Sequence, residues 1–251
     1  MPLIAKSAVA VLLISLVIAA ISRAEEAHWG YGQEHGPSQW SELKPEFETC
    51  RTGKHQSPID ISGAEKADLP AVDFKYQASP LHIVNNGHTI QVNMPAGSTI
   101  TVADHSYALL QFHFHTPSEE TIRGKHHALV AHFVHKDAEG KLAVVAVLFD
   151  VGKSNTVLAP VLAKMPPKEG PERTVEGTSL DPAKLLPSKQ GYYEFEGSLT
   201  TPPCSEGVRW FVLKQPVTLS QQQLDAFRRL YPRNARPTQP LNARIVRESA
   251  L

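Results

Sequence analysis

The segment QFHFH at residues 111–115 places two histidines at alternate positions in a stretch rich in strand-favouring residues. In a β-strand, side chains two residues apart point to the same face of the sheet. Gln111, His113 and His115 therefore share one face, while Phe112 and Phe114 share the other. Two imidazoles on one strand face predict a polar or metal-binding role for that side of the sheet.

A third histidine lies in the next long strand-like segment, ALVAHFVHK at residues 128–136. The connection is short, so the two strands are expected to be antiparallel neighbours. His113, His115 and His132 then form a set of three neutral imidazoles with a fourth position open, which is typical of catalytic zinc sites. His135 is an odd number of residues from His132 and should face the opposite side. The competing interpretation is a hydrogen-bonded core histidine, because two alternate histidines alone are a weak motif.

Polar residues beside this segment favour the metal interpretation. Gln111 can accept the N–H of a metal-bound imidazole, as the outer partners of metal ligands do. Glu119 and Glu120 follow the strand at a turn, where a carboxylate could orient a metal-bound water or accept its proton. A solvated turn is the more common fate of such a glutamate pair.

The rest of the chain indicates one mainly β domain of the α+β type, with few helices. Asn86-Gly87 separates two strand-like runs and predicts a hairpin. A helix is predicted over residues 220–231, capped by Ser220 with Gln223 three residues later. Residues 25–60 are interpreted as an irregular arm and residues 164–190 as a long surface loop. The predicted strands are LHIVN (81–85), HTIQVNM (88–94), STITV (98–102), YALLQFHFHT (107–116), ALVAHFVHK (128–136), LAVVAVLFDV (142–151), GYYEFEG (191–197) and VRWFVL (208–213).

Composition and the N-terminus indicate an exported chain. Residues 1–24 combine Lys6, an apolar run and small residues before Glu25, which is typical of a cleaved signal peptide. A membrane anchor is the alternative, but the run is shorter than the ~20 residues of a usual span. The domain is then residues 25–251. The 25 basic and 25 acidic residues balance, so neither nucleic acid nor a charged membrane surface is indicated as a partner.

The chain has two cysteines, Cys50 and Cys204. An exported protein can hold a disulfide, and two cysteines allow one pairing. Closing so long a loop would stabilise the fold by roughly 5 kcal/mol in the chain-entropy model. Two free thiols far apart are the alternative.

Several further motifs occur in a characteristic order with QFHFH. They are HWGYG (28–32), QSPIDI (56–61), NNGH (85–88), SEE (118–120), AHFVH (131–135), SLTTPPC (198–204) and RPTQPLN (236–242). With these motifs the chain strongly resembles the α-class carbonic anhydrases in their short exported bacterial form. The resemblance covers essentially residues 27–246, and HFH with SLTTPP downstream is highly specific in combination.

The resemblance implies a central, strongly twisted and mostly antiparallel sheet of about ten strands, with a few short peripheral helices. It implies one Zn²⁺ per chain at the base of a conical cleft, bound by His113, His115 and His132. Gln111 would support His113, and the backbone near Asn234 would support His115. The implied activity is the reversible hydration of CO₂ to bicarbonate and a proton by attack of a zinc-bound hydroxide.

The resemblance also implies roles for residues around the metal. Thr200 would accept a hydrogen bond from the zinc hydroxide and pass its own proton to Glu119. His88 matches the proton shuttle, although an exposed turn histidine is the alternative without the resemblance. The residues that would hold the water chain to His88 are Tyr31, Asn86 and Gln91. The residues matching the CO₂ pocket are Val134, Val144, Leu199 and Trp210, for which plain core is the alternative. The backbone of Thr200 and Thr201 is where anionic and sulfonamide-type inhibitors would dock.

The chain departs from the family at two positions. The glutamate that usually stands two residues before the third zinc histidine falls on Val130, which would face His132 and cannot accept its N–H. The hypothesis is that His132 is less well oriented and that zinc binds about 10- to 100-fold more weakly. Glu120 replaces a residue that is commonly histidine in the family. The hydrogen-bond network beside Glu119 is therefore expected to differ from that of the family.

The prediction is therefore an exported, periplasmic or secreted, zinc carbonic anhydrase acting on CO₂ and bicarbonate. A binding protein of the same fold with a weakened zinc site is the alternative, favoured only by Val130. A zinc buffer using His126 and His127 is a further alternative, and an unrelated zinc hydrolase fits the motifs less well. The resemblance also allows a homodimer, and no membrane contact is expected after signal cleavage.

Overall fold

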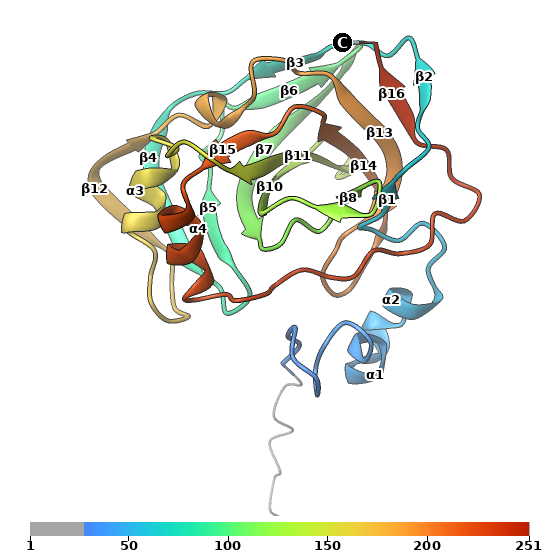
Figure 1. Cartoon of the computed structure of the whole chain (residues 1–251), viewed down its shortest axis with the longest axis horizontal. Coiled ribbons are helices and arrows are strands. Elements are labelled where there is room, and N and C mark those ends of the chain that lie inside the picture. Colours follow the sequence, from blue (N-terminus) through green and yellow to red (C-terminus); the bar gives the residue numbers. More distant parts are fainter. Residues whose placement is uncertain (1–27, 251) are drawn as a thin grey trace, which may run out of the picture.

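The computed structural model describes residues 28–250, so the predicted signal peptide, residues 1–24, lies outside the described residues. A sheet of 13 strands runs through the centre of this part of the chain, and a smaller sheet of three strands lies beside it (Figure 1). The strands are β1 (Asp60–Ile61), β2 (Glu65–Ala67), β3 (Val72–Lys75), β4 (Ser79–Asn85), β5 (Ile90–Asn93), β6 (Thr99–Val102), β7 (His105–His115), β8 (Thr121–Ile122), β9 (Lys125–His126), β10 (Leu129–Lys136), β11 (Leu142–Val151), β12 (Arg173–Leu180), β13 (Tyr192–Ser198), β14 (Glu206–Leu213), β15 (Val217–Leu219) and β16 (Arg247–Ser249).

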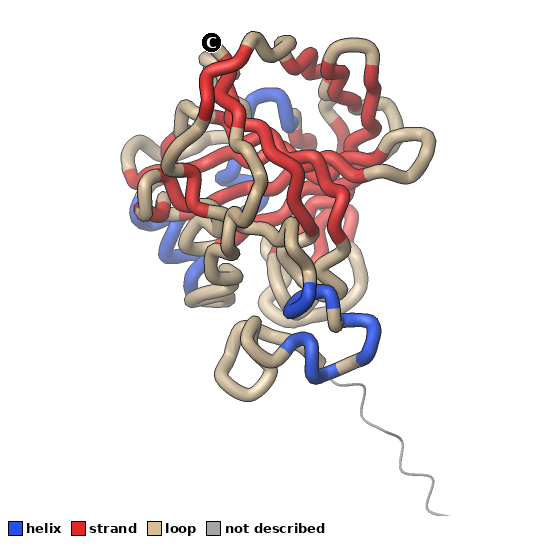
Figure 2. The backbone as a smooth tube through the Cα atoms, turned by 90° about the vertical axis from the view of Figure 1, so that its right-hand side faces the viewer, coloured by secondary structure: helices blue, strands red, loops and turns tan. Residues whose placement is uncertain are grey.

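The main path of the large sheet has the order β12-β4-β5-β7-β10-β11-β14-β13-β16-β2. Most neighbours are antiparallel, whereas β11 pairs parallel with β14 and β15, and β16 pairs parallel with β2. The small sheet has the order β1-β8-β9. Strands fill the centre, with helices and loops around them (Figure 2). This confirms the expected single, mainly β fold with a large, mostly antiparallel sheet.

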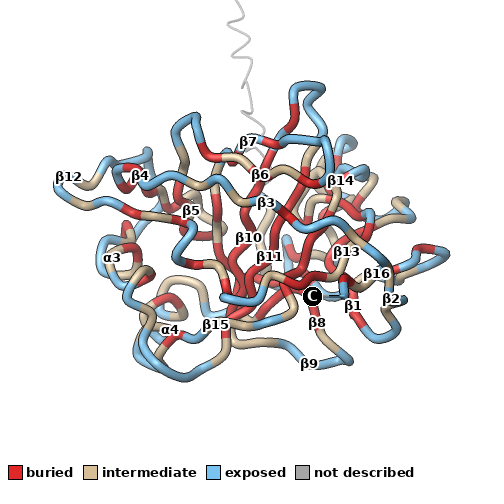
Figure 3. The backbone as a smooth tube through the Cα atoms, turned by 90° about the horizontal axis from the view of Figure 1, so that it is seen from above, coloured by how far each residue is buried: buried red, intermediate tan, exposed pale blue. Residues whose placement is uncertain are grey.

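The register of the central strands follows from the alternation in their sequences. In the β7–β10 pair His132 lies opposite His113, and Val130 lies opposite His115. Phe112 and Phe114 belong to the apolar core on the other face of the sheet, which helices α3 (Leu158–Ala163) and α4 (Gln221–Arg228) help to cover. Burial is most continuous along β10 and β11 (Figure 3).

His135 confirms the expected change of face. The β7–β10 register shifts between Val134 and His135. The His135 ring is fully buried and its Nε2 lies 2.8 Å from the Tyr76 hydroxyl. Tyr76 packs against the core on the face opposite the three-histidine set.

Helices are short and peripheral in the described residues. Ser220 and Gln223 form the predicted capping box at the start of α4. The helix ends at Arg228, earlier than expected, and Tyr231 packs against the core from beyond the helix. The other helical segments are α1 (Trp40–Leu43), α2 (Thr49–Thr52) and the 3₁₀ turns Pro45–Phe47 and Pro182–Leu185. No helix within residues 28–250 is both long and apolar enough to cross a membrane.

Two expectations about irregular segments are corrected. The predicted loop 164–190 contains β12, which pairs antiparallel with β4 at the edge of the sheet. β12 is mostly exposed and lacks an apolar face, so its sequence gave little strand signal. The N-terminal arm contains α1 and α2, which lie away from the sheet in Figure 1.

A disulfide between Cys50 and Cys204 fastens the arm to the rest of the fold, as predicted. The buried Arg236 guanidinium donates hydrogen bonds to the Cys50 carbonyl at 2.9 Å and to the Ser57 carbonyl at 2.7 Å. It also stacks over the Trp40 ring at 5.6 Å. The disulfide and Arg236 therefore both tie the arm to later parts of the chain.

Candidate metal centre

The three histidines predicted to act together converge in space. One ring nitrogen from each of His113, His115 and His132 lies within 4.8 Å of the others. His115 and His132 are each 1% exposed, whereas His113 is partly accessible. Pairing of β7 with β10 alone produces this cluster, because His113 and His132 are opposite each other and His115 follows on the same face.

Hydrogen bonds determine which nitrogen of the β7 histidines faces the cluster. The Nδ1 of His115 donates to the backbone carbonyl of Asn234 at 2.7 Å. The Nδ1 of His113 lies 2.8 Å from Oε1 of Gln111. A carbonyl oxygen only accepts, so Nδ1 carries the proton in both rings and Nε2 keeps its lone pair. Asn234 is held in turn by the Thr116 backbone N–H, which donates to its Oδ1 at 2.8 Å.

His132 is oriented by a residue that the sequence did not indicate for this role. Its Nε2 lies 3.0 Å and 3.3 Å from the two carboxylate oxygens of Glu120. Nδ1 of His132 is then the nitrogen that faces the cluster. Val130 contributes only apolar packing, in a cluster with Val134 and Trp210. The expectation that His132 lacks an acceptor is therefore wrong, because a turn residue replaces the missing strand residue.

These residues fit a tetrahedral zinc site with one open position. The Nε2 of His115 is buried and has no hydrogen-bond partner among the described residues. Burial, and then the nearby His132, lowers the pKa of His113 to about 3, and the same causes lower the pKa of His115. Both rings are neutral at physiological pH, as metal ligands must be. Burial also acts to lower the pKa of His132, but the Glu120 carboxylate outweighs burial and raises it, so this ring would release a proton when a metal binds. Three neutral imidazole nitrogens are then a donor set that zinc accepts.

Glu119 lies at the edge of the cluster and is fully buried. Its Oε1 accepts the backbone N–H of Arg236 at 2.8 Å, and its Oε2 lies 3.5 Å from Nε2 of His115. Burial raises the pKa of Glu119 to about 7, and the Glu120 charge adds to the rise, while His132 and the Thr200 hydroxyl oppose it. Thr200 is itself 5% exposed. The structure thus brings Glu119 and Thr200 together beside the histidines.

An apolar wall adjoins His132. Val134, Val144 and Trp210 lie side by side across β10, β11 and β14, because each is opposite the next in the sheet register. Leu199 packs against the same cluster. The Trp210 ring meets the His132 ring edge-on, with centroids 4.9 Å apart. Thr201 follows Thr200, and its carbonyl accepts the Cys204 N–H at 2.9 Å.

The polar residues expected to lead away from the centre lie on β5 and the hairpin before it. Gln91 is opposite His113 in the β5–β7 register, and its Oε1 accepts a hydrogen bond from Asn86 at 3.4 Å. The Oδ1 of Asn86 accepts the His88 backbone N–H at 3.0 Å. The Tyr31 hydroxyl is buried, and burial and then the charge of Glu119 raise its pKa well above the usual value. Tyr31 thus lies near Glu119, and the His88 carbonyl accepts a hydrogen bond from the Asn234 side chain at 3.0 Å.

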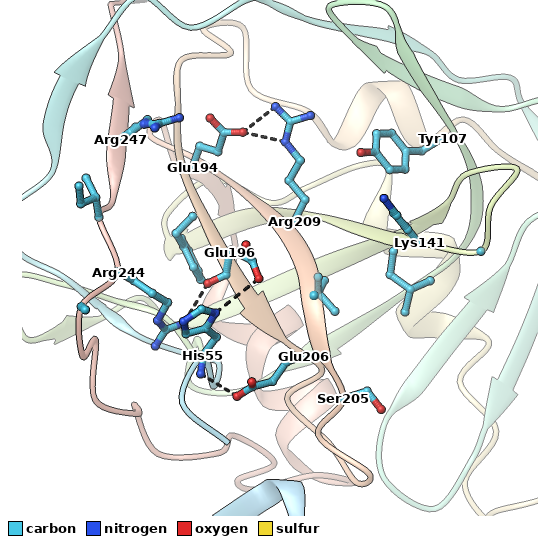
Figure 4. A pocket seen from close by; sticks show the side chains of 17 residues that line it. His55, Tyr107, Lys141, Glu194, Glu196, Ser205, Glu206, Arg209, Arg244 and Arg247 are labelled. Carbon is cyan, nitrogen blue, oxygen red and sulfur yellow. Dashed lines mark hydrogen bonds and ion pairs between the residues drawn. The ribbon is translucent and has the colours of Figure 1, made fainter. Parts of the chain in front are cut away.

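Other polar clusters in the described residues offer weaker alternatives. His126 and His127 are engaged by the Ser118 carbonyl and the Asp150 carboxylate, at 2.6 Å and 2.8 Å. A cavity of about 960 Å³ along β13 and β14 is lined by none of the residues named above for the metal centre (Figure 4). Within it Arg209 pairs with Glu194 at 2.6 Å, and Nδ1 of His55 lies 3.4 Å from Glu196. Neither feature competes with the three-histidine centre.

Comparison with known proteins agrees with this geometry. The model of the eukaryotic-type carbonic anhydrase family matches residues 35–250. Carbonic anhydrase from Pectobacterium atrosepticum is 43% identical over 94% of this chain and 96% of its own length. Carbonic anhydrase from Klebsiella pneumoniae is 47% identical over 88% of this chain and 91% of its own length. The α-carbonic anhydrase of Thermovibrio ammonificans, solved with the inhibitor sulfanilamide, superposes with a TM-score of 0.85 at 49% identity, covering 88% of this chain and 99% of that one.

Proposed function

The chain belongs to the eukaryotic-type carbonic anhydrase family, the α class, and we propose that its three-histidine centre binds one Zn²⁺ per chain. The activity of the protein is that of a carbonic anhydrase, the reversible hydration of CO₂ to bicarbonate and a proton. The observation that carries the zinc proposal is the convergence of three imidazole nitrogens, of which Nε2 of His115 is buried without a partner. Bound there, zinc would supply a Lewis acid that lowers the pKa of a coordinated water to about 7.

The roles of Thr200 and Glu119 follow from their hydrogen-bonding capacity. A hydroxyl donates one hydrogen bond and accepts others, while an ionised carboxylate only accepts. With its proton directed to Glu119, the Thr200 oxygen is left as an acceptor for a proton on the attacking oxygen. The pair would therefore orient that oxygen and reject a group that has no proton to donate.

The apolar wall suits a substrate that carries no charge. CO₂ has no ionic group to bind, so a site for it should exclude water and provide apolar contact. Val134, Val144 and Trp210 provide such a surface directly beside His132, with Leu199 at its edge. The relative solved with sulfanilamide supports binding of sulfonamide-type inhibitors. Thr200 and Thr201 are proposed as the place where these inhibitors, and anions, would bind.

The proton released by the reaction must reach the solvent. His88 is proposed as the group that transfers it, through water held by Tyr31, Asn86 and Gln91. An imidazole suits this role because its ordinary pKa is near neutrality. An exported, periplasmic location is proposed from the signal-like N-terminus. A homodimer stays a prediction, which light scattering of the purified protein would test.

Metal content and CO₂ hydration together test this proposal. Residues 25–251 would be purified, their zinc measured, and stopped-flow hydration followed with and without added Zn²⁺. One zinc per chain with fast hydration is expected. Bound zinc without hydration would instead favour the binding-protein alternative, whose one supporting feature, an unsupported His132, is removed by the Glu120 contact. Several zinc ions per chain would favour a zinc buffer.

A further inference from the structure

Glu120 is buried inside the protein, where an ionised carboxylate is unfavourable unless it is paired. It is 0% exposed, and so is the adjacent Glu119. Buried carboxylates are rare unless they are paired, because the desolvation of an ion costs several kcal/mol. The side chain of Glu120 finds its partner in Nε2 of His132, at 3.0 Å and 3.3 Å. The contact therefore accounts for both oxygens of a group that would otherwise destabilise the fold.

The turn that carries Glu120 is fixed by its own network. The Ser118 hydroxyl donates to the Glu120 carbonyl at 2.7 Å. The hydroxyl of Thr121 donates to Asp60 at 2.6 Å, in the parallel pairing of β1 with β8. The Glu120 backbone is thus held within the turn, and Thr121 ties the turn to Asp60. This fixes the direction of the carboxylate toward His132.

The position of Glu120 on the turn also keeps its charge away from the apolar wall beside His132. Val130 is 0% exposed and packs in the cluster that contains Val134 and Trp210. An acceptor at position 130 would put a carboxylate into that cluster. An acceptor at position 120 reaches the same imidazole from the turn, and the face of β10 beside His132 stays apolar.

We propose that Glu120 is the positioning residue for His132, holding its proton on Nε2 so that Nδ1 presents a lone pair to the metal. This inference rests on the proposed zinc centre and deepens it. His113 and His115 have the opposite arrangement, with the proton on Nδ1. A carboxylate that accepts the Nε2 proton also raises the basicity of the ring. Nδ1 of His132 should therefore bind a metal more strongly than it would with a neutral hydrogen-bond acceptor at Nε2.

The first test reads the proton position in the metal-free protein. Two-bond ¹H–¹⁵N correlation spectra, at a pH where His132 is neutral, distinguish an Nε2–H ring from an Nδ1–H ring. We expect Nε2–H in the wild type and in Glu120→Gln, whose amide oxygen can still accept. Glu120→Leu should give a mixture of the two forms. An Nδ1–H ring in the wild type, or an unchanged ring in Glu120→Leu, would overturn the proposal.

The second test measures zinc affinity by competition with a chelator. Glu120→Leu is expected to weaken zinc binding about 10- to 100-fold, as loss of an outer partner does. Glu120→Gln should weaken it less, because it loses the charge and keeps the acceptor. Glu176→Gln, at an exposed position of β12, is the matched control and should bind as the wild type does. Circular dichroism of each variant establishes that it is folded.

The outcomes separate this inference from the proposed function. Wild-type protein that binds no zinc would refute the zinc centre, while the spectra would still decide the role of Glu120. Zinc-binding wild type with unchanged affinity in both Glu120 variants would refute only the inference. If Glu120→Leu does not fold, two results would still test the proposal. Zinc affinity equal to wild type in Glu120→Gln would refute the role of the Glu120 charge. An Nδ1–H ring on His132 in the wild type would refute the role of Glu120 in placing the proton.

Discussion

The indole ring of Trp29 lies parallel to the imidazole of His88, with ring centroids 3.5 Å apart and an interplanar angle of 8°. The His28 ring also stacks on the His88 imidazole, with ring centroids 4.8 Å apart. Burial, and then the nearby His28, lowers the pKa of His88 to about 4. A proton relay works best when its pKa is near the working pH. In this stacked position His88 is a weak proton acceptor, so transfer at neutral pH should involve a ring that has left Trp29.

Replacing Trp29 by alanine tests this relationship. Trp29→Ala removes the ring that buries His88, so the pKa of His88 should rise from about 4 toward its ordinary value of 6.5. An NMR titration of the histidine ring protons measures it. Trp29→Phe retains an aromatic face and should keep most of the lowering. An unchanged pKa in Trp29→Ala would mean that the rest of the pocket, rather than the stack, sets it.

Removing the proposed proton acceptor should slow the enzyme only when buffer cannot replace it. His88→Ala is expected to reduce CO₂ hydration in weak buffer by a factor on the order of 100, the usual contribution of a positioned acid–base group. Imidazole added to the assay should restore much of the rate, since it titrates near neutrality. His82→Ala is a suitable control, because His82 is a partly exposed histidine hydrogen-bonded to Thr174 on the edge strands. Equal rates for wild type and His88→Ala in weak buffer would assign proton transfer to another group.

Zinc removal should lower stability as well as activity. A metal that binds only the native state stabilises it by about 2.7 kcal/mol when present at 100 times its Kd. Dialysis against a chelator is expected to lower the thermal midpoint by several degrees, and Zn²⁺ should restore it. Mg²⁺ serves as the control, since it prefers oxygen ligands and should have no effect. Identical melting curves with and without zinc would contradict a metal centre in the core of the sheet.

The strands around the metal centre could be predicted because local pattern and tertiary environment agree there. QFHFH alternates, so the shared face of His113 and His115 follows from strand geometry alone. The segment 128–136 is long and apolar, and a short connection makes it the neighbour of β7. By contrast, β12 is an exposed edge strand whose pairing with β4 depends on contacts distant in sequence. No local pattern marks such a strand.

Glu120 shows why the environment of a site is harder to predict than its ligands. Two glutamates at a turn are usually solvated, and nothing in SEE states which way they point. The direction of Glu120 comes from the Ser118 hydrogen bond and from the pairing of β1 with β8, which joins residues about 60 positions apart. The substitution at Val130 was visible in the sequence, but its compensation was visible only in three dimensions.

The disulfide should stabilise the loop that carries Thr200 and Thr201. Cys204 donates its backbone N–H to Thr201, and its carbonyl accepts from Gln56 at 3.0 Å. The double variant Cys50→Ala/Cys204→Ala is expected to lose about 2–5 kcal/mol of unfolding free energy, as is usual when a native disulfide is removed. Urea unfolding of oxidised wild type and of the variant gives this difference. A reducing agent should destabilise the wild type and leave the variant unchanged. A variant as stable as the wild type would show that contacts other than the disulfide, such as those of Arg236, hold the arm.

His135 should make the fold sensitive to acid. Its ring is buried against Tyr76, and burial lowers its pKa from 6.5 to about 3. Between these pH values the unfolded chain binds a proton at this position that the folded chain does not. The contribution of His135 to the free energy of unfolding is therefore fully present above pH 6.5 and declines as the pH falls, by about 1.4 kcal/mol per pH unit.

His135→Gln, which does not titrate, should be less stable than the wild type at pH 7, and the difference in unfolding free energy should narrow at that rate below pH 6.5. Urea unfolding of both metal-free proteins across this range measures the difference, and the other histidines cancel because both proteins contain them. A difference that stays constant with pH would show that His135 is already protonated in the folded state or that it is neutral in both states.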